Sequence, residues 1–249
     1  MTEIRNVDYH CHLDLYPDYE AQFRRCAEQN VEVFSMTTTP LAWEKNKELS
    51  RTAPNIRIGL GIHPQIVGTK EADIALFERL IDETRYVGEV GLDAGPRFYK
   101  NYALQKEVFE RVLKASARSG NKILSLHTVR TGSQVLKMIE EHFPESAGRV
   151  VLHWFSGSVA EAKRARDYGC WFSINESMGR SENGRRIIQA LPIDRLLTET
   201  DGPFTESKPG VPTDPWDVSR AAKMIAEIKG ITEAEMRSRV WQNLLTLES

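Results

Sequence analysis

Histidine and carboxylate side chains close a series of short apolar runs along this chain, and they are the residues best suited to chemistry. The chain has six histidines, and five of them occupy such positions. The residues at these positions are His10, His12, His63, Glu89, His127, His153, Glu199 and Asp201. Imidazole nitrogens and carboxylate oxygens are common ligands of Zn, Mn and related ions. The pattern therefore predicts a metal-dependent hydrolase.

The spacing of His10 and His12 is the strongest local signal. On a strand, residues i and i+2 share a face, so both imidazoles can converge on one ion while Cys11 points the other way. A pair of polar residues at a strand end is the alternative interpretation. Candidate ligands at the ends of later runs favour the metal site. The six predicted ligands are His10, His12, Glu89, His127, His153 and Asp201.

Six ligands from five runs suit a pair of divalent ions, for which Mg, Mn and Zn are the candidates. Two ions roughly 3.5–4 Å apart would lower the pKa of a shared water and stabilise charge on the attacking and leaving oxygens. Glu89 lies in the middle of the set and is predicted to be the bridging, catalytic carboxylate. Asp201 is predicted to orient the attacking water and accept its proton, in addition to binding metal.

Further residues are predicted to contact the substrate or to support the ligands: His63, Glu199, Trp154, Phe204, Arg97 and Arg130. His63 either contacts a phosphate or is a pore-lining histidine satisfied by its neighbours. Glu199 shares a strand face with Asp201 and is expected to orient a ligand histidine. Trp154 and Phe204 either stack on unpaired bases or pack the barrel mouth, and the two arginines follow strands where they can contact phosphates.

Eight apolar runs alternate with amphipathic segments along the whole chain. The runs at 31–40 and 169–177 join the six that end in the polar residues above. Between them lie segments of helical periodicity such as 101–119, which Gly120 is expected to end. Alternating strands and helices imply parallel strands. Eight such units favour an α/β fold of the (β/α)₈ TIM type, regular or distorted, over a doubly wound open sheet.

No linker or low-complexity stretch divides the sequence, so residues 1–249 are expected to form one hydrolase domain. The segment 202–216 is the most irregular part, because it carries four prolines directly after the last strand. It is expected to be a non-helical loop that shapes one wall of the site.

Composition and charge bear on location and partners. A net charge of −2 and an isoelectric point near 6.3 argue against a protein that binds nucleic acid with its whole surface, and leave a local basic rim open. The three cysteines show no CxxC spacing, which indicates neither a disulfide framework nor a thiolate zinc site. No apolar run reaches the roughly 18 residues of a membrane span. We therefore expect a cytoplasmic protein without membrane contact.

The motifs, in this order, resemble those of the TatD family of metal-dependent deoxyribonucleases. The matching pieces are DYHCHLD at 8–14, GIHP at 61–64, GEVGLD at 88–93, HWFSG at 153–157 and ETDGP at 199–203. The resemblance implies an amidohydrolase-like barrel and hydrolysis of phosphodiester bonds in DNA, often from the 3′ end. It also implies that His10, His12, Glu89 and Asp201 hold one metal, and that Glu89, His127 and His153 hold the second.

Within this family, several stretches are similar to QatD, the TatD-family nuclease of Qat anti-phage defence systems. They are 8–18, SMTTTP at 35–40, CWFSINESM at 170–178 and LLTETDGPF at 196–204. This resemblance implies protein partners encoded in the same defence operon. The rim departs from the wider family, since Gln65 stands where many members have histidine and the loops 94–98 and 212–215 are altered. The metal ligands are kept while the substrate rim differs.

These observations predict a metal-dependent enzyme that cleaves DNA as a 3′-exonuclease in anti-phage defence. Single strands and frayed ends are the expected substrates, because a site at a barrel mouth reaches a strand end more easily than an internal bond of a duplex. Two alternatives stay open. One is an amidohydrolase-like enzyme that opens a lactone, amide or phosphotriester bond in a small molecule. The other is a non-catalytic nucleic-acid-binding subunit of a defence complex.

Overall fold

Two parallel sheets form the wall of a distorted barrel in the computed structural model, which describes residues 4–249. The first sheet joins β1 (Asn6–Cys11), β2 (Val31–Met36) and β3 (Ile56–Gly59). The second sheet has the order β4, β5, β6, β7 and β8. Its strands are Tyr86–Asp93, Lys122–Val129, Gly148–His153, Trp171–Ile174 and Leu196–Thr198. Neighbouring strands within both sheets pair in parallel.

The strand ladder is interrupted where the two sheets meet. Between β3 and β4, the Leu60 N–H donates to the Tyr86 carbonyl (3.0 Å) and the Gly88 N–H donates to the Leu60 carbonyl (2.9 Å). On the other side, the Asp201 N–H, just after β8, donates to the His10 carbonyl of β1 (2.8 Å). The predicted TIM-type barrel is thus confirmed in its distorted form, with a wall that is not one closed ladder.

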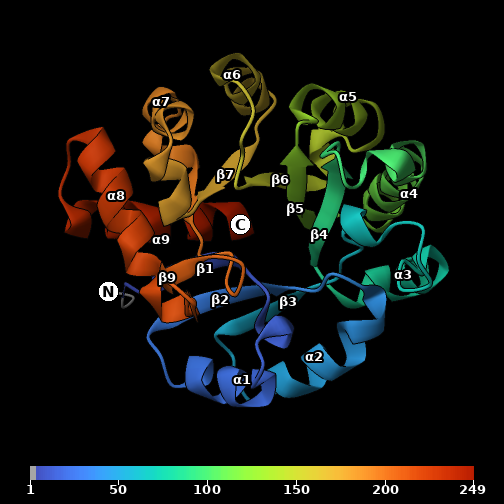
Figure 1. Cartoon of the computed structure of the whole chain (residues 1–249), viewed down its shortest axis with the longest axis horizontal. Helices are drawn as coiled ribbons and strands as arrows, with labels where there is room; N and C mark the ends of the chain where they lie inside the picture. The colour runs from blue at the N-terminus through green and yellow to red at the C-terminus, as the bar shows by residue number, and fades with distance from the viewer. Residues whose placement is uncertain (1–3) are drawn as a thin grey trace.

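Helices lie outside the strands around the barrel (Figure 1). They are α1 (Tyr19–Ala27), α2 (Trp43–Ser50), α3 (Ile74–Leu80), α4 (Tyr102–Ser119), α5 (Gly132–His142), α6 (Val159–Asp167), α7 (Glu182–Ala190), α8 (Ser219–Lys229) and α9 (Glu233–Glu248). Helix α4 shows why they form, because its buried Phe109, Val112 and Leu113 make one apolar face. Gly120 ends α4 with a φ of +71°, as its sequence position predicts.

Short 3₁₀ helices connect many of these elements. They are η1 (Leu13–Leu15), η2 (Pro40–Ala42), η3 (Pro64–Ile66), η4 (Ile81–Glu83), η5 (Tyr99–Asn101), η6 (Glu145–Ala147), η7 (Glu176–Arg180), η8 (Ile193–Arg195) and η9 (Pro215–Val218). The last of them corrects one expectation. The segment 202–216 is not entirely non-helical, because Pro215 opens η9, and α8 begins at Ser219.

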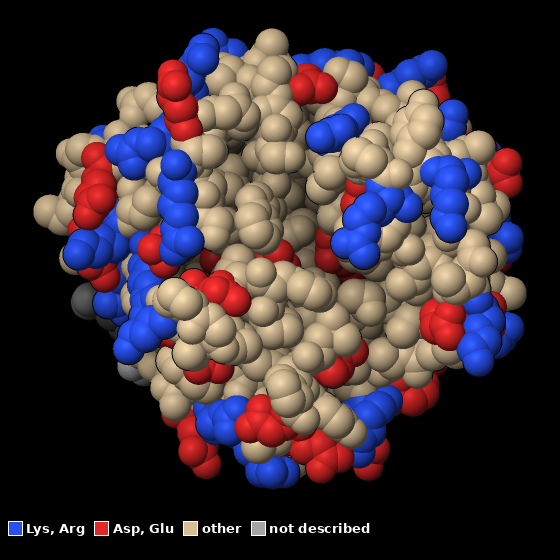
Figure 2. Space-filling model, viewed as in Figure 1, with Lys and Arg blue, Asp and Glu red and all other residues tan. Residues whose placement is uncertain are grey.

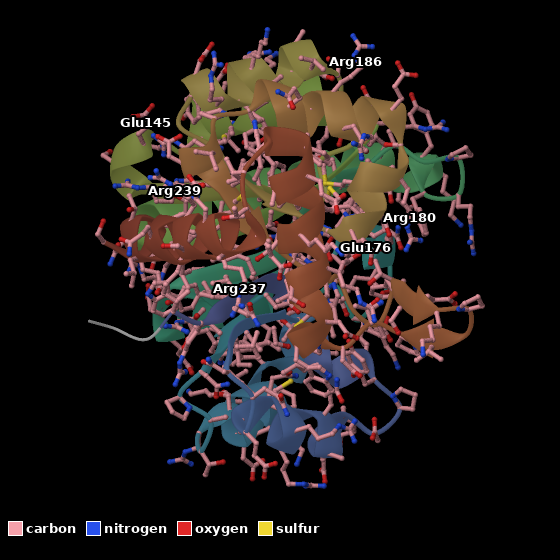
Figure 3. The ribbon with its side chains drawn as sticks, turned by 90° about the vertical axis from the view of Figure 1, so that its left-hand side faces the viewer. Glu145, Glu176, Arg180, Arg186, Arg237 and Arg239 are labelled. Atoms are coloured by element: carbon pink, nitrogen blue, oxygen red, sulfur yellow. The ribbon has the colours of Figure 1, made fainter. Side chains whose placement is uncertain are left out.

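The rest of the segment after β8 forms an antiparallel hairpin that the sequence did not predict. Its strands are β9 (Glu206–Lys208) and β10 (Val211–Pro212). Figure 3 shows this hairpin at the same end of the molecule as Glu176 and Arg180, whereas Glu145 lies at the opposite end. Glu176 and Arg180 follow β7 and Glu145 precedes β6, so the hairpin lies at the carboxyl ends of the strands.

Nearly all strand residues are buried on both faces, as expected for strands covered by helices, and apolar side chains make up most of this core. Helix α9 is fixed to the start of β8 by Asn243, whose side chain donates to the carbonyls of Ile193 (2.8 Å) and Leu196 (2.7 Å). All three cysteines are buried and free. In the part of the chain that the structure describes, none of the helices has the length and apolar character needed to cross a membrane.

Candidate metal centre

The carboxyl ends of the strands surround a cavity of about 550 Å³. Figure 2 shows the hollow in the middle of this face. The cavity wall includes His63, Glu89, His127, His153 and Asp201. Glu89 and His127 lie within β4 and β5, His153 ends β6, and His63 and Asp201 follow β3 and β8. Small-ligand sites commonly have this volume, and TIM-type enzymes carry their active sites at this end of the barrel. We call this space the central cavity.

One oxygen of Glu89 faces the two histidines of β1 and its following loop. Glu89 is 2% exposed, and its Oε2 lies 3.4 Å from His10 Nε2 and 3.2 Å from His12 Nε2. The Asp201 Oδ1 atom lies 3.8 and 3.5 Å from the same two nitrogens. Four potential ligand groups therefore converge at one point.

The other oxygen of Glu89 faces three further histidines. Its Oε1 lies 2.6 Å from His127 Nδ1, 3.2 Å from His63 Nε2 and 3.3 Å from His153 Nε2. The five imidazoles that sequence reasoning singled out are thus divided between the two oxygens of a single carboxylate. This is the arrangement that a carboxylate bridging two ions requires.

Partners behind His10 and His12 hold their rings. The Nδ1–H of His12 donates to the Met36 carbonyl (2.8 Å), and His10 Nδ1 lies 2.7 Å from the Ser125 hydroxyl. These contacts leave the Nε2 atoms turned toward Glu89, 3.2 Å from each other. Second-sphere contacts of this kind fix the orientation and tautomer of metal-binding histidines.

Glu199 lies next to His153, on the side of its Nδ1 atom. Both carboxylate oxygens are 3.2 Å from His153 Nδ1. The carboxylate also accepts hydrogen bonds from the Asn175 side chain (3.0 Å), the Trp154 N–H (3.1 Å) and the Ser173 hydroxyl. Burial raises the pKa of Glu199, although His153 acts in the opposite direction. Glu199 thus contacts the Nδ1 side of His153, while Nε2 of the same ring faces Glu89.

Asp93 supports His127 in a similar way, and sequence reasoning missed it. Its Oδ2 lies 3.2 Å from His127 Nε2 and accepts a hydrogen bond from the Gln65 side chain (2.8 Å). Burial alone would raise the pKa of Asp93, but hydrogen bonds from His127, Gln65 and the Gly95 N–H lower it to about 2. The signal was available, because Asp93 lies four residues after Glu89 on the same strand face.

Burial and charge set the protonation of this cluster. Burial and the neighbouring His153 lower the pKa of His10 to about 3, so His10 is neutral and its Nε2 can be a ligand. Burial also opposes a charge on His12, but hydrogen bonds to Asp201 and Glu89 raise its pKa to about 10. Burial would raise the pKa of Glu89, yet the surrounding imidazoles, His63 and His153 first among them, hold it well below its ordinary value.

His63 differs from the other histidines in its tautomer. The Gln65 N–H donates to His63 Nδ1 (3.2 Å), so a neutral His63 carries its proton on Nε2. Burial lowers the pKa of His63, which favours this neutral form. His63, Glu89 and His127 lie close enough together to hold an ion. The position of the proton nevertheless argues that His63 acts as a hydrogen-bond donor rather than a ligand.

The residues present fit divalent ions. Two overlapping groups, His10 with Glu89 and His153, and His10 with His12 and Asp201, each place their ligand atoms within 4.8 Å of one another. All of these side chains are buried. Burying polar and charged groups costs free energy unless they are paired or coordinate a metal, and a bound cation would offset the carboxylate charges here. Nitrogen and oxygen donors together suit Zn and Mn, and the carboxylates also suit Mg.

The predicted substrate contacts fall into two groups. Trp154 and Phe204 line the central cavity, and Phe204 is 62% exposed with its ring edge-on to His12 (5.3 Å between centroids). The backbone of Trp154 has a φ of +39°, a region that a bulky residue rarely adopts. Arg97 and Arg130 are exposed and lie outside the cavity wall. The structure therefore does not bring these two arginines to the metal cluster.

Comparison with known proteins identifies the family to which this chain is similar. Residues 7–249 match the family model described as TatD related DNase. The deoxyribonuclease TATDN3 of Homo sapiens is 30% identical over 261 residues, covering 97% of this chain and 93% of that protein. The metal-dependent hydrolase YjjV of Escherichia coli (strain K12) is 27% identical over 260 residues, covering 98% of this chain and 97% of that protein.

Solved structures agree with the sequence matches. The crystal structure of the TatD homologue YjjV from Escherichia coli K12 has a TM-score of 0.86 and 25% identity, covering 98% of each chain. A TatD family hydrolase from Entamoeba histolytica shares the fold, with a TM-score of 0.81, 17% identity and 99% coverage of each chain. Because the family model spans almost the whole sequence, this chain belongs to the TatD-related DNase family.

Proposed function

We propose that this chain is a two-metal deoxyribonuclease that removes nucleotides from the 3′ ends of single-stranded or frayed DNA. One observation carries the proposal: the two oxygens of Glu89 face five imidazoles, two on one side and three on the other. Bound Mg, Mn or Zn ions would lower the pKa of a water molecule and stabilise charge on the oxygens of a phosphodiester. The 3′ polarity follows from the family resemblance of the motifs.

Each residue of the cluster has a proposed role. His10, His12, Glu89 and Asp201 would hold one ion, and Glu89, His127 and His153 would hold the other. The first set gathers on the side of Glu89 Oε2 and the second on the side of Glu89 Oε1. The Asp201 carboxylate lines the cavity, where it can orient a water by a hydrogen bond and take its proton. His63 can donate its Nε2–H to a phosphate oxygen.

The cavity wall favours a strand end over a duplex. Besides the metal cluster, the wall presents apolar side chains, among them Leu15, Ile66, Val129 and Phe204. Apolar and aromatic groups suit the faces of unpaired bases, which a duplex does not expose. The test is cleavage of matched single-stranded, blunt duplex and frayed duplex DNA. The proposal predicts the order single strand, frayed duplex, blunt duplex, and fastest cleavage of the blunt duplex would contradict it.

A role in anti-phage defence is proposed from the sequence resemblance at 8–18, 35–40, 170–178 and 196–204 alone. In this proposal residues 1–249 act as one cytoplasmic domain, alongside other products of a Qat operon. Phage plating efficiency on cells that carry the operon tests the role. Replacing wild-type protein with Glu89→Ala should restore phage growth, and unchanged protection would contradict the proposal.

A second candidate function is hydrolysis of a small molecule at the same site. One observation favours it: among the described residues, the wall of the central cavity contains no lysine or arginine. A wall without cations suits a compact substrate with little charge. A substrate screen at fixed metal concentration separates the candidates, because an enzyme for lactones, amides or phosphotriesters should turn these over and leave oligonucleotides intact.

A further inference from the structure

A second groove adjoins the central cavity on the side of α4 and α5. It has a volume of about 620 Å³, and we call it the outer groove. Residues that line it include Tyr102, Arg130, Thr131, Ser133, Gln134 and Lys137. Val129 lines the central cavity, and the next residue, Arg130, lines the outer groove. The two spaces are therefore adjacent where β5 ends.

An aromatic stack borders the outer groove. The rings of Tyr99 and Tyr102 are stacked, with centroids 5.6 Å apart and an interplanar angle of 9°. Tyr99 is 62% exposed, although an aromatic ring of this size is usually more deeply buried. The Lys106 ammonium lies 5.5 Å from the centre of the Tyr102 ring. Stacked, exposed rings next to cations are the usual platform for unpaired bases.

The charge of the groove suits a phosphate backbone. Arg130 is exposed and forms no ion pair within residues 4–249. Its φ of +57° places it in the left-handed region, which is uncommon for arginine. The carboxylate of Glu161 also lines the groove, but it accepts hydrogen bonds from the N–H and hydroxyl groups of Ser133 and Ser158.

The wider surface agrees with this charge. In Figure 2, basic side chains gather beside the central hollow in the region of α4 and α5. Arg97 and Lys100, in the loop that leads into α4, are exposed and have no ion-pair partner in the part of the chain that the structure describes. The central cavity itself is lined by no lysine or arginine among these residues, so a phosphate that pairs with either of these side chains must lie outside it.

We propose that the outer groove binds the part of a single-stranded DNA substrate that extends beyond the scissile bond. One or more bases would stack on Tyr99 and Tyr102, while Arg130 contacts a phosphate. This inference rests on the proposed function, since it places the strand end in the central cavity. It explains how a protein with a net negative charge and no lysine or arginine in the wall of its central cavity can hold a polyanion.

The test compares substrates of two lengths. Steady-state cleavage of a single-stranded 12-mer and of a dinucleotide is measured for the wild type, Tyr99→Ala, Tyr99→Phe and Arg130→Gln. The control is Arg186→Gln, because Arg186 projects into solvent from α7 (Figure 3). In parallel, binding of the 12-mer without divalent metal is followed by fluorescence anisotropy at several salt concentrations.

Tyr99→Ala should raise the KM for the 12-mer relative to that for the dinucleotide by about five- to tenfold, the lower range for one lost base stack. Tyr99→Phe, which keeps the ring, should preserve the wild-type ratio, as should Arg186→Gln. Arg130→Gln should reduce the slope of log affinity against log salt by about 0.7, the value for one phosphate contact with a single strand.

Two outcomes would overturn different parts of the account. If the wild type cleaves DNA and both Tyr99→Ala and Arg130→Gln show wild-type length preference and salt slope, the outer groove is not a DNA subsite. If no variant cleaves DNA, the proposed function fails, and the anisotropy series alone decides the groove. Unchanged affinity of Tyr99→Ala and Arg130→Gln for the 12-mer would then exclude it.

Discussion

Replacing Glu199 by glutamine tests how the protein presents His153 to a metal. The Glu199 carboxylate is the acceptor for His153 Nδ1, with both oxygens 3.2 Å away. In Glu199→Gln, the amide oxygen can still accept from the Trp154 N–H and the Asn175 side chain. That oxygen also stays 3.2 Å from His153 Nδ1, but it is now a neutral acceptor shared by three donors. The amide nitrogen that replaces the second oxygen can donate to the Ser173 hydroxyl but cannot accept from His153 Nδ1.

The consequence is a weaker preference for the Nδ1–H tautomer of His153. One neutral, shared oxygen replaces two carboxylate oxygens behind Nδ1, so the proton shifts toward Nε2, the atom that faces Glu89 (3.3 Å). A protonated Nε2 cannot bind a metal. Loss of such an orienting carboxylate typically lowers metal affinity or activity by about 10- to 100-fold, which corresponds to about 1.4–2.7 kcal/mol. We expect a loss within this range.

The assay is isothermal titration calorimetry, in which Zn or Mn is added to the chelator-stripped protein and the metal affinity is measured. The matched control is Glu161→Gln. Glu161 is a residue of α6 whose carboxylate also accepts several hydrogen bonds, from Ser133 of α5 and from Ser158, but it lies outside the metal cluster. Glu161→Gln should bind metal like the wild type. The reasoning is refuted if Glu199→Gln binds metal with wild-type affinity while it remains folded, or if both variants lose affinity equally.

Further predictions concern stability and substrate contact. Burial alone would raise the pKa of Glu161, but hydrogen bonds from Ser158 and Ser133 lower it. The ionised carboxylate therefore stabilises the folded protein at pH values above the ordinary carboxyl pKa of about 4.3. This stabilisation is lost as the pH falls through the lowered pKa of the folded state. Melting curves should therefore show Glu161→Gln less stable than the wild type at pH 7, with the gap closing below about pH 4; a constant gap would contradict this. Phe172→Ala should cost about 3–5 kcal/mol in chemical denaturation, because its fully buried ring packs on Phe155, and a cost below about 1 kcal/mol would show that the core refills. Phe204→Ala should raise the KM for single-stranded DNA about fivefold or more if its exposed ring stacks on a base, and an unchanged KM would limit Phe204 to packing.

The strands and their polar ends could be predicted from the sequence because both depend on short-range patterns. A β-strand alternates its faces every residue, so the His10 and His12 pair and the histidines at the ends of β5 and β6 fall on predictable faces. The parallel barrel then brings these ends together. The two interruptions in the wall could not be predicted, because they depend on how far neighbouring strands are offset, as at the Leu60 contacts with β4.

Partners that reach across strands were missed for the same reason. Ser125 meets His10 from a strand 115 residues away in sequence, and Asp8 accepts hydrogen bonds from the N–H (2.8 Å) and hydroxyl (2.6 Å) of Thr200. Serine and aspartate at such positions carry no motif, and only strand register reveals the contact. The stacked Tyr99 and Tyr102 were missed as well, since η5 and the start of α4 determine their spacing.

The most direct test of the central claim measures metal content and DNA cleavage in the same samples. Chelator-stripped wild type and Glu89→Gln are reloaded with Mn or Zn, their bound metal is counted per chain, and each is incubated with 3′- and 5′-labelled single-stranded DNA. We predict two ions per wild-type chain and stepwise metal-dependent loss from the 3′ end, with at most one ion and no cleavage in Glu89→Gln. Two ions and wild-type cleavage in Glu89→Gln, or no cleavage by the wild type with any metal, would contradict the account.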